Sequence, residues 1–251
     1  MPRPQTKPRA CEAEAPVVPP PAPVPAAPLS TAPALGAVEA SGATEASGPP
    51  PQPAKLPPQP EKPKPPKPKG GPVIIGITGA SRCGKSWVAK ELQQRLGSER
   101  VAVVGQDAYW RRACRVKAKD GREASSEEEP ECTDHGAFAK AISSAAAKRP
   151  CVIAEGFQLL YDKRVVDILD HMFLLEIGSE ECIRRRSAQR GPHNGNPLSL
   201  WKCENLLWPA HERYLESSVA PLGDKVQRIP GPSSAEDVAA IAKSIVEATG
   251  L

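Results

Sequence analysis

The stretch "VIIGITGASRCGKSWVAKEL", Val73 to Leu92, decides the fold of this chain. It opens with a short apolar run rich in β-branched residues, Val73–Thr78, which predicts a buried strand. The next eight residues, Gly79–Ser86, match the pattern G-x-x-x-x-G-K-[ST]. Val88 and Leu92 then recur at helical spacing. The sequence therefore predicts a strand, a loop and a helix in the order that a phosphate-binding loop requires.

The residue types in Gly79–Ser86, which we call the phosphate loop, suit an anion. Glycine lets the backbone wrap tightly, so that successive N–H groups point at one phosphate, and the start of the helix adds its dipole. Lys85 can reach the β- and γ-phosphates, and the Ser86 hydroxyl can ligate Mg²⁺. The loop thus predicts a nucleoside triphosphate site. Its predicted nucleotide contacts are Gly79, Ala80, Ser81, Arg82, Cys83, Gly84, Lys85 and Ser86.

Strand and helix patterns alternate after the phosphate loop. The further predicted strands are Val101–Val104, Cys151–Glu155, His171–Ile177 and, at an edge of the sheet, Lys225–Ile229. Such alternation is typical of a parallel sheet covered on both faces. We therefore expect an α/β fold: a P-loop NTPase three-layer sandwich with a mainly parallel sheet and a helical lid, preceded by a disordered Pro-rich tail.

Three local features complete this prediction. Residues 111–133 are charged and irregular, and predict a loop. Glu180–Arg190 predicts a basic helix that would form the lid, with "GPHNGNP" after it as the mobile lid end. Ser233 is expected to cap the last helix, with Glu236 three residues on as a capping box.

The first part of the chain differs in composition from the rest. Of 31 prolines, 23 fall in residues 1–72. Such a segment cannot bury enough apolar surface to offset chain entropy, so residues 1–71 predict a disordered Pro/Ala-rich tail. It is interpreted either as a solvated linker or as a docking segment for domains that bind proline-rich motifs. Residues 72–251 have the length of one domain with its own core.

Charge and hydropathy exclude several classes of protein. Residues 72–251 contain 25 Lys and Arg and 24 Asp and Glu, so the domain lacks the excess of basic residues that is typical of a nucleic-acid binder. We expect no membrane span, because no apolar run approaches about 18 residues. Seven scattered cysteines without a C-x-x-C pair predict reduced thiols and a cytoplasmic protein. The N-terminal segment leaves organelle targeting open.

Two acids follow predicted strands. Asp107 comes just after Val101–Val104, and Glu155 closes "CVIAE". Residues at the carboxyl ends of parallel strands line the ligand crevice. Asp107 is therefore a candidate for accepting a proton from an attacking hydroxyl or for holding the metal, and Glu155 for a second metal ligand. Either acid could instead serve only as a local cap.

The chain resembles the nicotinamide riboside kinases, in the uridine kinase-like group of small P-loop kinases. The similarity is carried by "IIGITGASRCGKS", "VAVVGQDAYW", "CVIAEGFQLL", "FLLEIGSEECIRRRSAQR" and "WPAHERYLE", which follow one another over most of residues 73–250. This resemblance implies an ATP-dependent enzyme that phosphorylates the ribose 5′-hydroxyl of nicotinamide riboside or nicotinic acid riboside, feeding NAD synthesis.

The resemblance also implies roles for single residues. Asp107 falls on the catalytic carboxylate, with Lys85 beside the phosphates, and Ser86 and Glu155 fall on the metal positions. Arg185 and Arg186 fall on lid arginines that contact phosphates and substrate.

In "ECTDHGAF", Asp134 falls on the residue that holds the ribose hydroxyls. Thr133 departs from the pattern, since it stands where the relatives place an aromatic against the base. Tyr109 or Trp110 could supply the flat surface instead.

Two classes of function stay open on the residues. One is a kinase with ATP as co-substrate, Mg²⁺ as cofactor and a small nucleoside as acceptor, with uridine, cytidine or pantothenate kinases as rivals. The other is a non-catalytic nucleotide-binding adaptor recruited through the tail. The absence of an N-K-x-D motif disfavours a GTPase, and the acid at position 107 favours the kinase.

Overall fold

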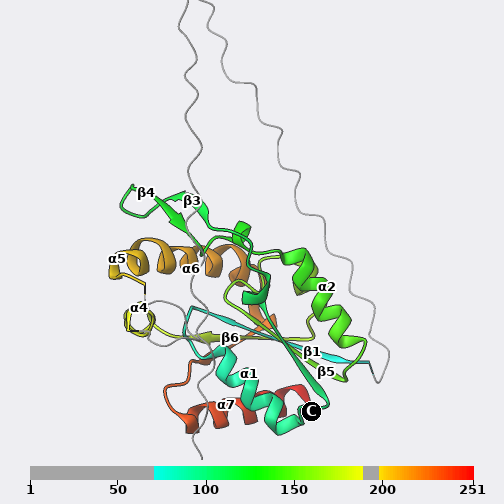
Figure 1. Ribbon diagram of the computed structural model, residues 1–251. Helices are drawn as coiled ribbons and strands as arrows, with labels where there is room; N and C mark the ends of the chain where they lie inside the picture. Colours follow the sequence, from blue (N-terminus) through cyan, green and yellow to red (C-terminus); the bar gives the residue numbers. More distant parts are fainter. Residues whose placement is uncertain (1–70, 189–197) are drawn as a thin grey trace, which may run out of the picture. The chain divides into compact units, whose positions relative to one another are not determined.

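A five-stranded parallel sheet organises the part of the chain that the computed structural model describes, residues 71–188 and 198–251. The strands are β1 (Val73–Gly79), β2 (Val101–Gly105), β5 (Cys151–Gly156), β6 (His171–Glu176) and β7 (Val226–Pro230). They lie in the order β2-β5-β1-β6-β7 (Figure 1). The predicted α/β sandwich is confirmed, whereas the tail and the expected lid end, with Gln189, Arg190 and "GPHNGNP", lie outside the described residues.

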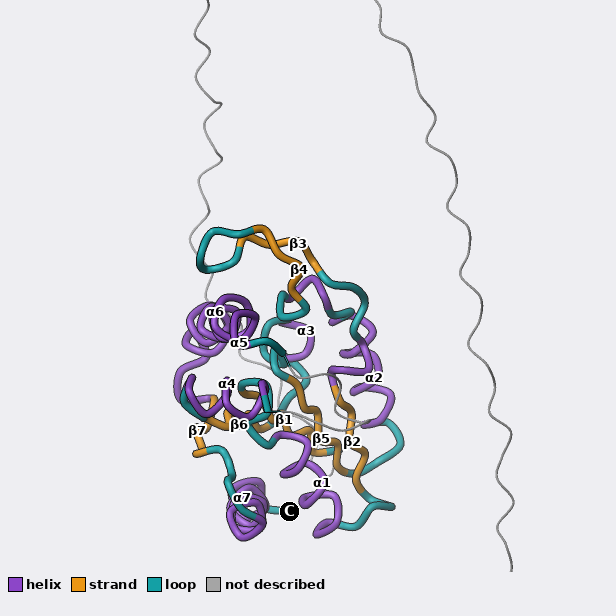
Figure 2. Tube along the Cα trace, turned by 60° about the vertical axis from the view of Figure 1, so that its left-hand side comes forward, coloured by secondary structure: helices purple, strands orange, loops and turns teal. Residues whose placement is uncertain are grey.

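Helices cover both faces of the sheet (Figure 2). The main helices are α1 (Lys85–Leu96), α2 (His135–Ala146), α3 (Lys163–Val166), α4 (Ser179–Ser187), α5 (Leu200–Lys202), α6 (Trp208–Tyr214) and α7 (Ala235–Thr249). Wider π-helical turns, Cys203–Leu207 and Leu215–Val219, flank α6, and tighter 3-10 turns form at Gln106–Tyr109, Pro130–Cys132 and Ala220–Lys225. None of the described helices has the length and apolar character needed to cross a membrane.

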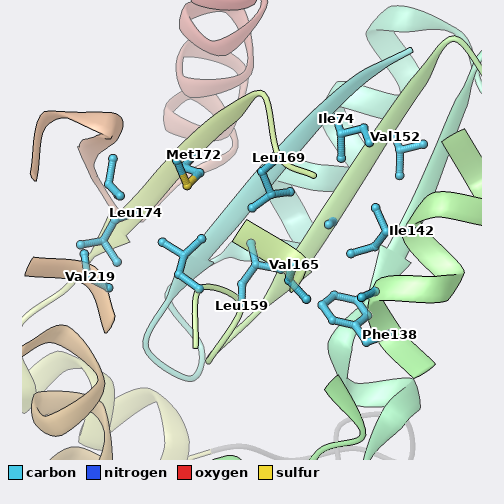
Figure 3. Packing of buried hydrophobic residues seen from close by; sticks show 14 of the residues in the cluster. Ile74, Phe138, Ile142, Val152, Leu159, Val165, Leu169, Met172, Leu174 and Val219 are labelled. Atoms are coloured by element: carbon cyan, nitrogen blue, oxygen red, sulfur yellow. The ribbon is translucent and has the colours of Figure 1, made fainter. Parts of the chain in front are cut away.

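Neighbouring residues of the central strands feed two separate cores, because successive side chains of a strand point to opposite faces. Ile75, Ile153 and Leu175 pack under α1 and α7. On the other face, Ile74, Val152 and Leu174 pack with residues of α2 and α3 and with Tyr214 and Val219, as Figure 3 shows for most of them. The unbroken apolar runs of the sequence are thus explained by burial on both faces.

Strand β2 differs from the prediction of a fully buried strand. It lies at the edge of the sheet, and its Val103 is 37% exposed. Strand β7 forms the other edge, as predicted.

The predicted loop at residues 111–133 contains a hairpin. Strands β3 (Cys114–Lys117) and β4 (Glu123–Ser126) pair antiparallel and form a sheet of their own. The Trp201 indole donates to Asp120 Oδ2 at 2.7 Å and lies 4.2 Å from the Arg122 guanidinium. These contacts attach the tip of the hairpin to α5.

The cap of the last helix lies one residue beyond the predicted position. Ser234, not Ser233, is the N-cap of α7, and its capping box is formed with Asp237, not Glu236. The Asp237 carboxylate also accepts hydrogen bonds from the Ser233 hydroxyl and amide, at 2.7 and 2.9 Å. One carboxylate thus serves both serines, and the residue whose side chain reaches the helix N–H groups becomes the cap.

Candidate active site

The phosphate loop joins β1 to α1 at the carboxyl edge of the sheet. Gly79 has φ 144° and Gly84 φ 101°, and a Cβ at Gly79 would collide with the carbonyl oxygen of Leu175. Arg82 also adopts a left-handed conformation, with φ 64°. The first turn of α1 carries no acidic residue, so its free N–H groups are open to an anion.

The Lys85 ammonium lies back on the loop that it belongs to. Its Nζ donates to the carbonyl oxygens of Gly79 and Ala80, at 3.1 and 2.8 Å, and lies 3.8 Å from the Cys83 sulfur. The side chain is buried, with 9% exposed. These backbone acceptors partner the ammonium and hold it beside the place where phosphates would bind.

A cavity of about 750 Å³, which we call the site cavity, opens in front of the phosphate loop. Eleven residues singled out from the sequence line it: Ser81, Arg82, Gly84, Lys85, Ser86, Asp107, Trp110, Thr133, Glu155, Arg185 and Arg186. Of the others, Gly79, Ala80 and Cys83 form the inner side of the loop. Tyr109 and Asp134 lie outside the lining.

Ser86 and Glu155 meet across the loop. The Ser86 hydroxyl donates to Glu155 Oε1 at 3.0 Å. Burial raises the pKa of Glu155 above its ordinary value. The Lys85 charge and the Ser86 hydrogen bond act in the opposite direction but only partly offset this rise. A hydroxyl and a carboxylate are the hard oxygen ligands that Mg²⁺ prefers, together with phosphate oxygens. The pair therefore fits the expected metal position.

Asp107 enters the same cavity from the turn that follows β2. Gly105 of β2 is in register with Glu155 of β5, so the two acids emerge from neighbouring parallel strands at one edge of the sheet. The Asp107 side chain is exposed to the cavity. This is the arrangement that the strand pattern predicted.

The arginines of α4 reach the loop from the lid side. Arg185 Nη1 donates to the Arg82 carbonyl at 3.2 Å and to the Pro232 carbonyl at 3.1 Å, while its Nε is held by Glu181. Burial, and after it the charge of the nearby Arg186, lowers the pKa of the Arg82 guanidinium. Three guanidinium groups therefore gather beside the phosphate loop, where phosphoryl oxygens would lie.

The four candidates for acceptor binding separate in space. Trp110 is bridged to Thr133, and both line the site cavity, with the indole 49% exposed. Tyr109 packs instead on the Phe138 ring, with ring centroids 5.3 Å apart. Asp134 caps α2, accepting from the Ala137 N–H at 2.9 Å, and this bond lowers its pKa. Trp110 is thus the aromatic beside Thr133.

Sequence reasoning missed Glu127 and Glu128, which we call the acid pair. Both follow β4 directly and line the site cavity. Burial raises the pKa of Glu128 to about 7; Arg186 opposes this shift, while Glu127 and Asp107 add to it. Only the folded hairpin brings this charged stretch of sequence to the cavity. The other missed lining residues are Trp87, Gln106, Phe157 and Ala188.

A buried chain of hydroxyl groups fixes helix α6 to the sheet. Tyr214 OH lies 2.8 Å from Thr78 Oγ1 and accepts from the Leu160 N–H at 3.0 Å. Thr78 Oγ1 in turn donates to the Gly156 carbonyl at 3.0 Å. The helix α6 is therefore tied to the ends of β1 and β5, next to the phosphate loop and Glu155.

The chain is similar in sequence to several uridine kinases. Uridine kinase from Clostridium perfringens (strain SM101 / Type A) is 23% identical over 171 residues, covering 58% of this chain and 82% of that protein. Uridine kinase from Shewanella sp. (strain ANA-3) is 27% identical over 191 residues, covering 61% and 89%. No model of a known protein family matches the chain.

Among solved structures, a possible uridine kinase from Bacillus stearothermophilus aligns with a TM-score of 0.41 at 17% identity, covering 62% of this chain and 89% of that one. A gluconokinase from Sinorhizobium meliloti 1021 aligns with a TM-score of 0.45 at 16% identity, covering 71% and 94%. In its phosphate loop, its parallel sheet and its sequence relatives, the chain is similar to the uridine kinase-like P-loop kinases.

Proposed function

We propose that residues 72–251 form a kinase domain that transfers the γ-phosphoryl group of ATP to the ribose 5′-hydroxyl of nicotinamide riboside. The observation that carries this proposal is the site cavity itself. Lys85, the α4 arginines, Asp107 and the acid pair all line this one cavity. The proposed phosphate site, the proposed base Asp107 and the acid pair thus line the same cavity.

Each residue has a defined task in this reaction. The amides of the phosphate loop and Lys85 bind the β- and γ-phosphates. Mg²⁺, held by Ser86 and Glu155, would supply neutralisation of phosphate charge. Asp107 accepts the proton of the attacking hydroxyl, and Arg185 and Arg186 stabilise the charge on the transferring phosphoryl group. Asp134 is proposed to hold the ribose hydroxyls.

The charge of the cavity wall favours nicotinamide over other bases. The nicotinamide ring of the riboside carries a positive charge, whereas uracil is neutral and nicotinic acid adds a carboxylate. Two acids, Glu127 and Glu128, line the cavity with the Trp110 indole, and the raised pKa of Glu128, about 7, leaves its carboxyl partly ionised at neutral pH, where a nearby cation would favour its charged form. Carboxylates and aromatic faces both attract cations. The same wall would repel the extra carboxylate of nicotinic acid riboside.

Uridine phosphorylation is the second candidate, and the sequence relatives favour it, because those quoted above are uridine kinases. The two candidates differ in the charge of the base, so the acid pair discriminates between them. Acidic side chains near the base would strengthen the binding of a positively charged nicotinamide ring, but not the binding of a neutral uracil ring.

The test is a panel of acceptors with labelled ATP: nicotinamide riboside, nicotinic acid riboside, uridine, cytidine and pantothenate. We expect the highest kcat/KM for nicotinamide riboside. Replacing the acid pair, Glu127→Gln with Glu128→Gln, should lower that value and leave uridine little changed. A preference for uridine that survives in this variant would replace the proposal by its rival. No phosphorylation of any acceptor would favour a nucleotide-binding adaptor.

A further inference from the structure

We call the part of the site cavity lined by Trp110 and Thr133 its acceptor end, and two thiols meet next to Thr133 in the chain. The sulfurs of Cys114 and Cys132 lie 3.6 Å apart, with the Cys132 thiol as donor. Cys114 opens β3 and Cys132 ends the turn after β4, so 18 positions of sequence separate them. A disulfide needs a sulfur–sulfur distance of about 2.0 Å, and the two groups are already in van der Waals contact.

The pair has one accessible member. Cys114 is partly exposed, while the remaining cysteines that the structure describes, Cys83, Cys132, Cys151, Cys182 and Cys203, are buried. An oxidant in solution therefore meets Cys114 first. The Cys132 sulfur lies within contact of both the Cys114 sulfur, at 3.6 Å, and the Ser126 carbonyl oxygen, at 3.5 Å, so it is held where it can meet an oxidised Cys114.

The hairpin that carries Cys114 has room to adjust. Strands β3 and β4 form a separate two-stranded sheet, and outward residues such as Arg115 and Lys117 are exposed. A two-stranded hairpin gains little stability of its own, so its strands yield more easily than those of the main sheet. Neither Cys114 nor Cys132 belongs to the hydrophobic clusters that form the buried cores.

We propose that Cys114 and Cys132 form a reversible intramolecular disulfide when the protein meets a hydroperoxide, and that this bond tunes the acceptor end of the site cavity. The Cys114 thiolate attacks one peroxide oxygen, forms an S–O bond and releases hydroxide, or alkoxide from an alkyl peroxide. The Cys132 sulfur then attacks the sulfenic sulfur, loses its proton and displaces the oxygen as water. Two thiols are oxidised, and the peroxide is reduced; a dithiol reverses the change.

The bond would act on the cavity through backbone that already contacts Cys132 and its neighbour Thr133. The Arg111 N–H donates to the Cys132 carbonyl at 2.7 Å, and Trp110 is bridged to Thr133. Trp110 and Thr133 line the cavity, and each lies next to this joined pair of segments. Drawing the sulfurs together shifts these two residues relative to each other. The phosphate loop lies on other elements, β1 and α1.

The direct test maps the linkage in the full-length chain. The folded protein is treated with hydrogen peroxide, its remaining thiols are alkylated after denaturation, and a non-reduced tryptic digest is analysed by mass spectrometry. Cleavage at the neighbouring Arg and Lys residues places Cys114 in peptide 113–115 and Cys132 in peptide 123–140. We expect these two peptides as a linked pair with two hydrogen atoms lost, and their release by dithiothreitol.

Two variants sharpen the test. Cys114→Ser should abolish the linked pair, whereas Cys11→Ser, in the tail, should leave it unchanged. If Cys114 and Cys132 are both recovered alkylated while other thiols oxidise, the site is refuted. This readout does not depend on whether the chain phosphorylates a nucleoside, so it stands apart from the proposed function.

The tuning is tested by kinetics with the acceptor that the panel identifies. In oxidised wild type we expect an altered KM for the acceptor and an unchanged KM for ATP. In Cys114→Ser, oxidation should change neither KM. A linked protein with unaltered acceptor KM would overturn the effect on the cavity. If oxidation abolishes ATP binding in wild type and also in Cys114→Ser, the loss comes from another thiol. That result would also overturn the proposed effect of the disulfide on the cavity.

Discussion

The Ser86 hydroxyl donates a hydrogen bond to Glu155 Oε1 at 3.0 Å, and this contact joins the phosphate loop to the end of β5. The two residues are 69 positions apart in the sequence. The pairing of β1 with β5, which sets Ile77 beside Glu155, brings them together. The sheet register therefore assembles the expected metal position.

Removing this carboxylate should weaken the use of metal. We expect Glu155→Gln to raise the Mg²⁺ concentration for half-maximal turnover by about 10- to 100-fold, the scale for losing a group that supports a metal ligand. Turnover measured against Mg²⁺ concentration checks this. Glu91→Gln, at a partly exposed position of α1 that pairs with Arg95, is the matched control, and an equal Mg²⁺ requirement in both variants would contradict the metal role.

Two aspartates should fail in different ways. Asp107→Asn keeps the shape of the side chain but removes the base, so we expect kcat to fall by about two to four orders of magnitude. Asp134→Asn should mainly raise the KM for the nucleoside, because a contact with the ribose exists in the ground state as well as in the transition state. Steady-state kinetics on both variants checks this.

The Asp134→Asn change should preserve the cap of α2. Asp134 caps α2, and asparagine is as good an N-cap as aspartate, so the fold should survive the change. An alanine there would also lose the cap, at a cost of about 1 kcal/mol. Equal, small effects of Asp107→Asn and Asp134→Asn would defeat the mechanism.

Glu128 should make stability depend on pH in a predictable direction. Its pKa rises from 4.5 to about 7 in the fold. Between these values the folded state keeps a proton that the unfolded state has lost, so this contribution to stability disappears as pH rises through about 7. Glu128→Gln should therefore raise the Tm relative to wild type at pH 8 and not at pH 4.

Thermal unfolding at the two pH values measures this difference. Glu127→Gln, the neighbouring exposed acid, should give a smaller difference between them. A constant offset between wild type and Glu128→Gln at both pH values would show that the Glu128 carboxyl titrates as it does in the unfolded chain.

The hydroxyl of Tyr214 should matter for the fold. Tyr214→Phe leaves the buried Leu160 N–H without its acceptor, so we expect a loss of about 1–3 kcal/mol in the free energy of unfolding. Denaturant unfolding measures it. Tyr161→Phe, with a side chain 46% exposed, should change stability much less. An equal effect of the two changes would mean that the buried hydroxyl chain adds nothing.

The sequence predicted the sheet because buried parallel strands and the phosphate loop leave strong local patterns. The apolar run Val73–Thr78 and the motif in Gly79–Ser86 need no tertiary information to be recognised. The positions of Asp107 and Glu155 follow from the same logic, since the carboxyl ends of parallel strands meet at one edge. These parts of the site were therefore predictable.

The hairpin and the acid pair were harder to predict. The residues of β3 and β4 are largely charged or polar, so they lack the apolar alternation of a core strand. The one local signal was the dipeptide Asp120–Gly121, a turn sequence, and Gly121 does adopt a positive φ of 88°. Contacts with Trp201, distant in sequence, then fix the tip. Glu127 and Glu128 reach the cavity only through this arrangement.

The folded-back position of Lys85 has a consequence for the thermodynamics of nucleotide binding. Its ammonium already holds the carbonyl oxygens of Gly79 and Ala80, so the loop keeps its shape before any phosphate arrives. Binding then exchanges one set of oxygen acceptors for another, and the conformational entropy of ordering the loop has been lost at folding. We therefore expect a small entropic penalty from the backbone when ATP binds, because the loop is a preformed receptor.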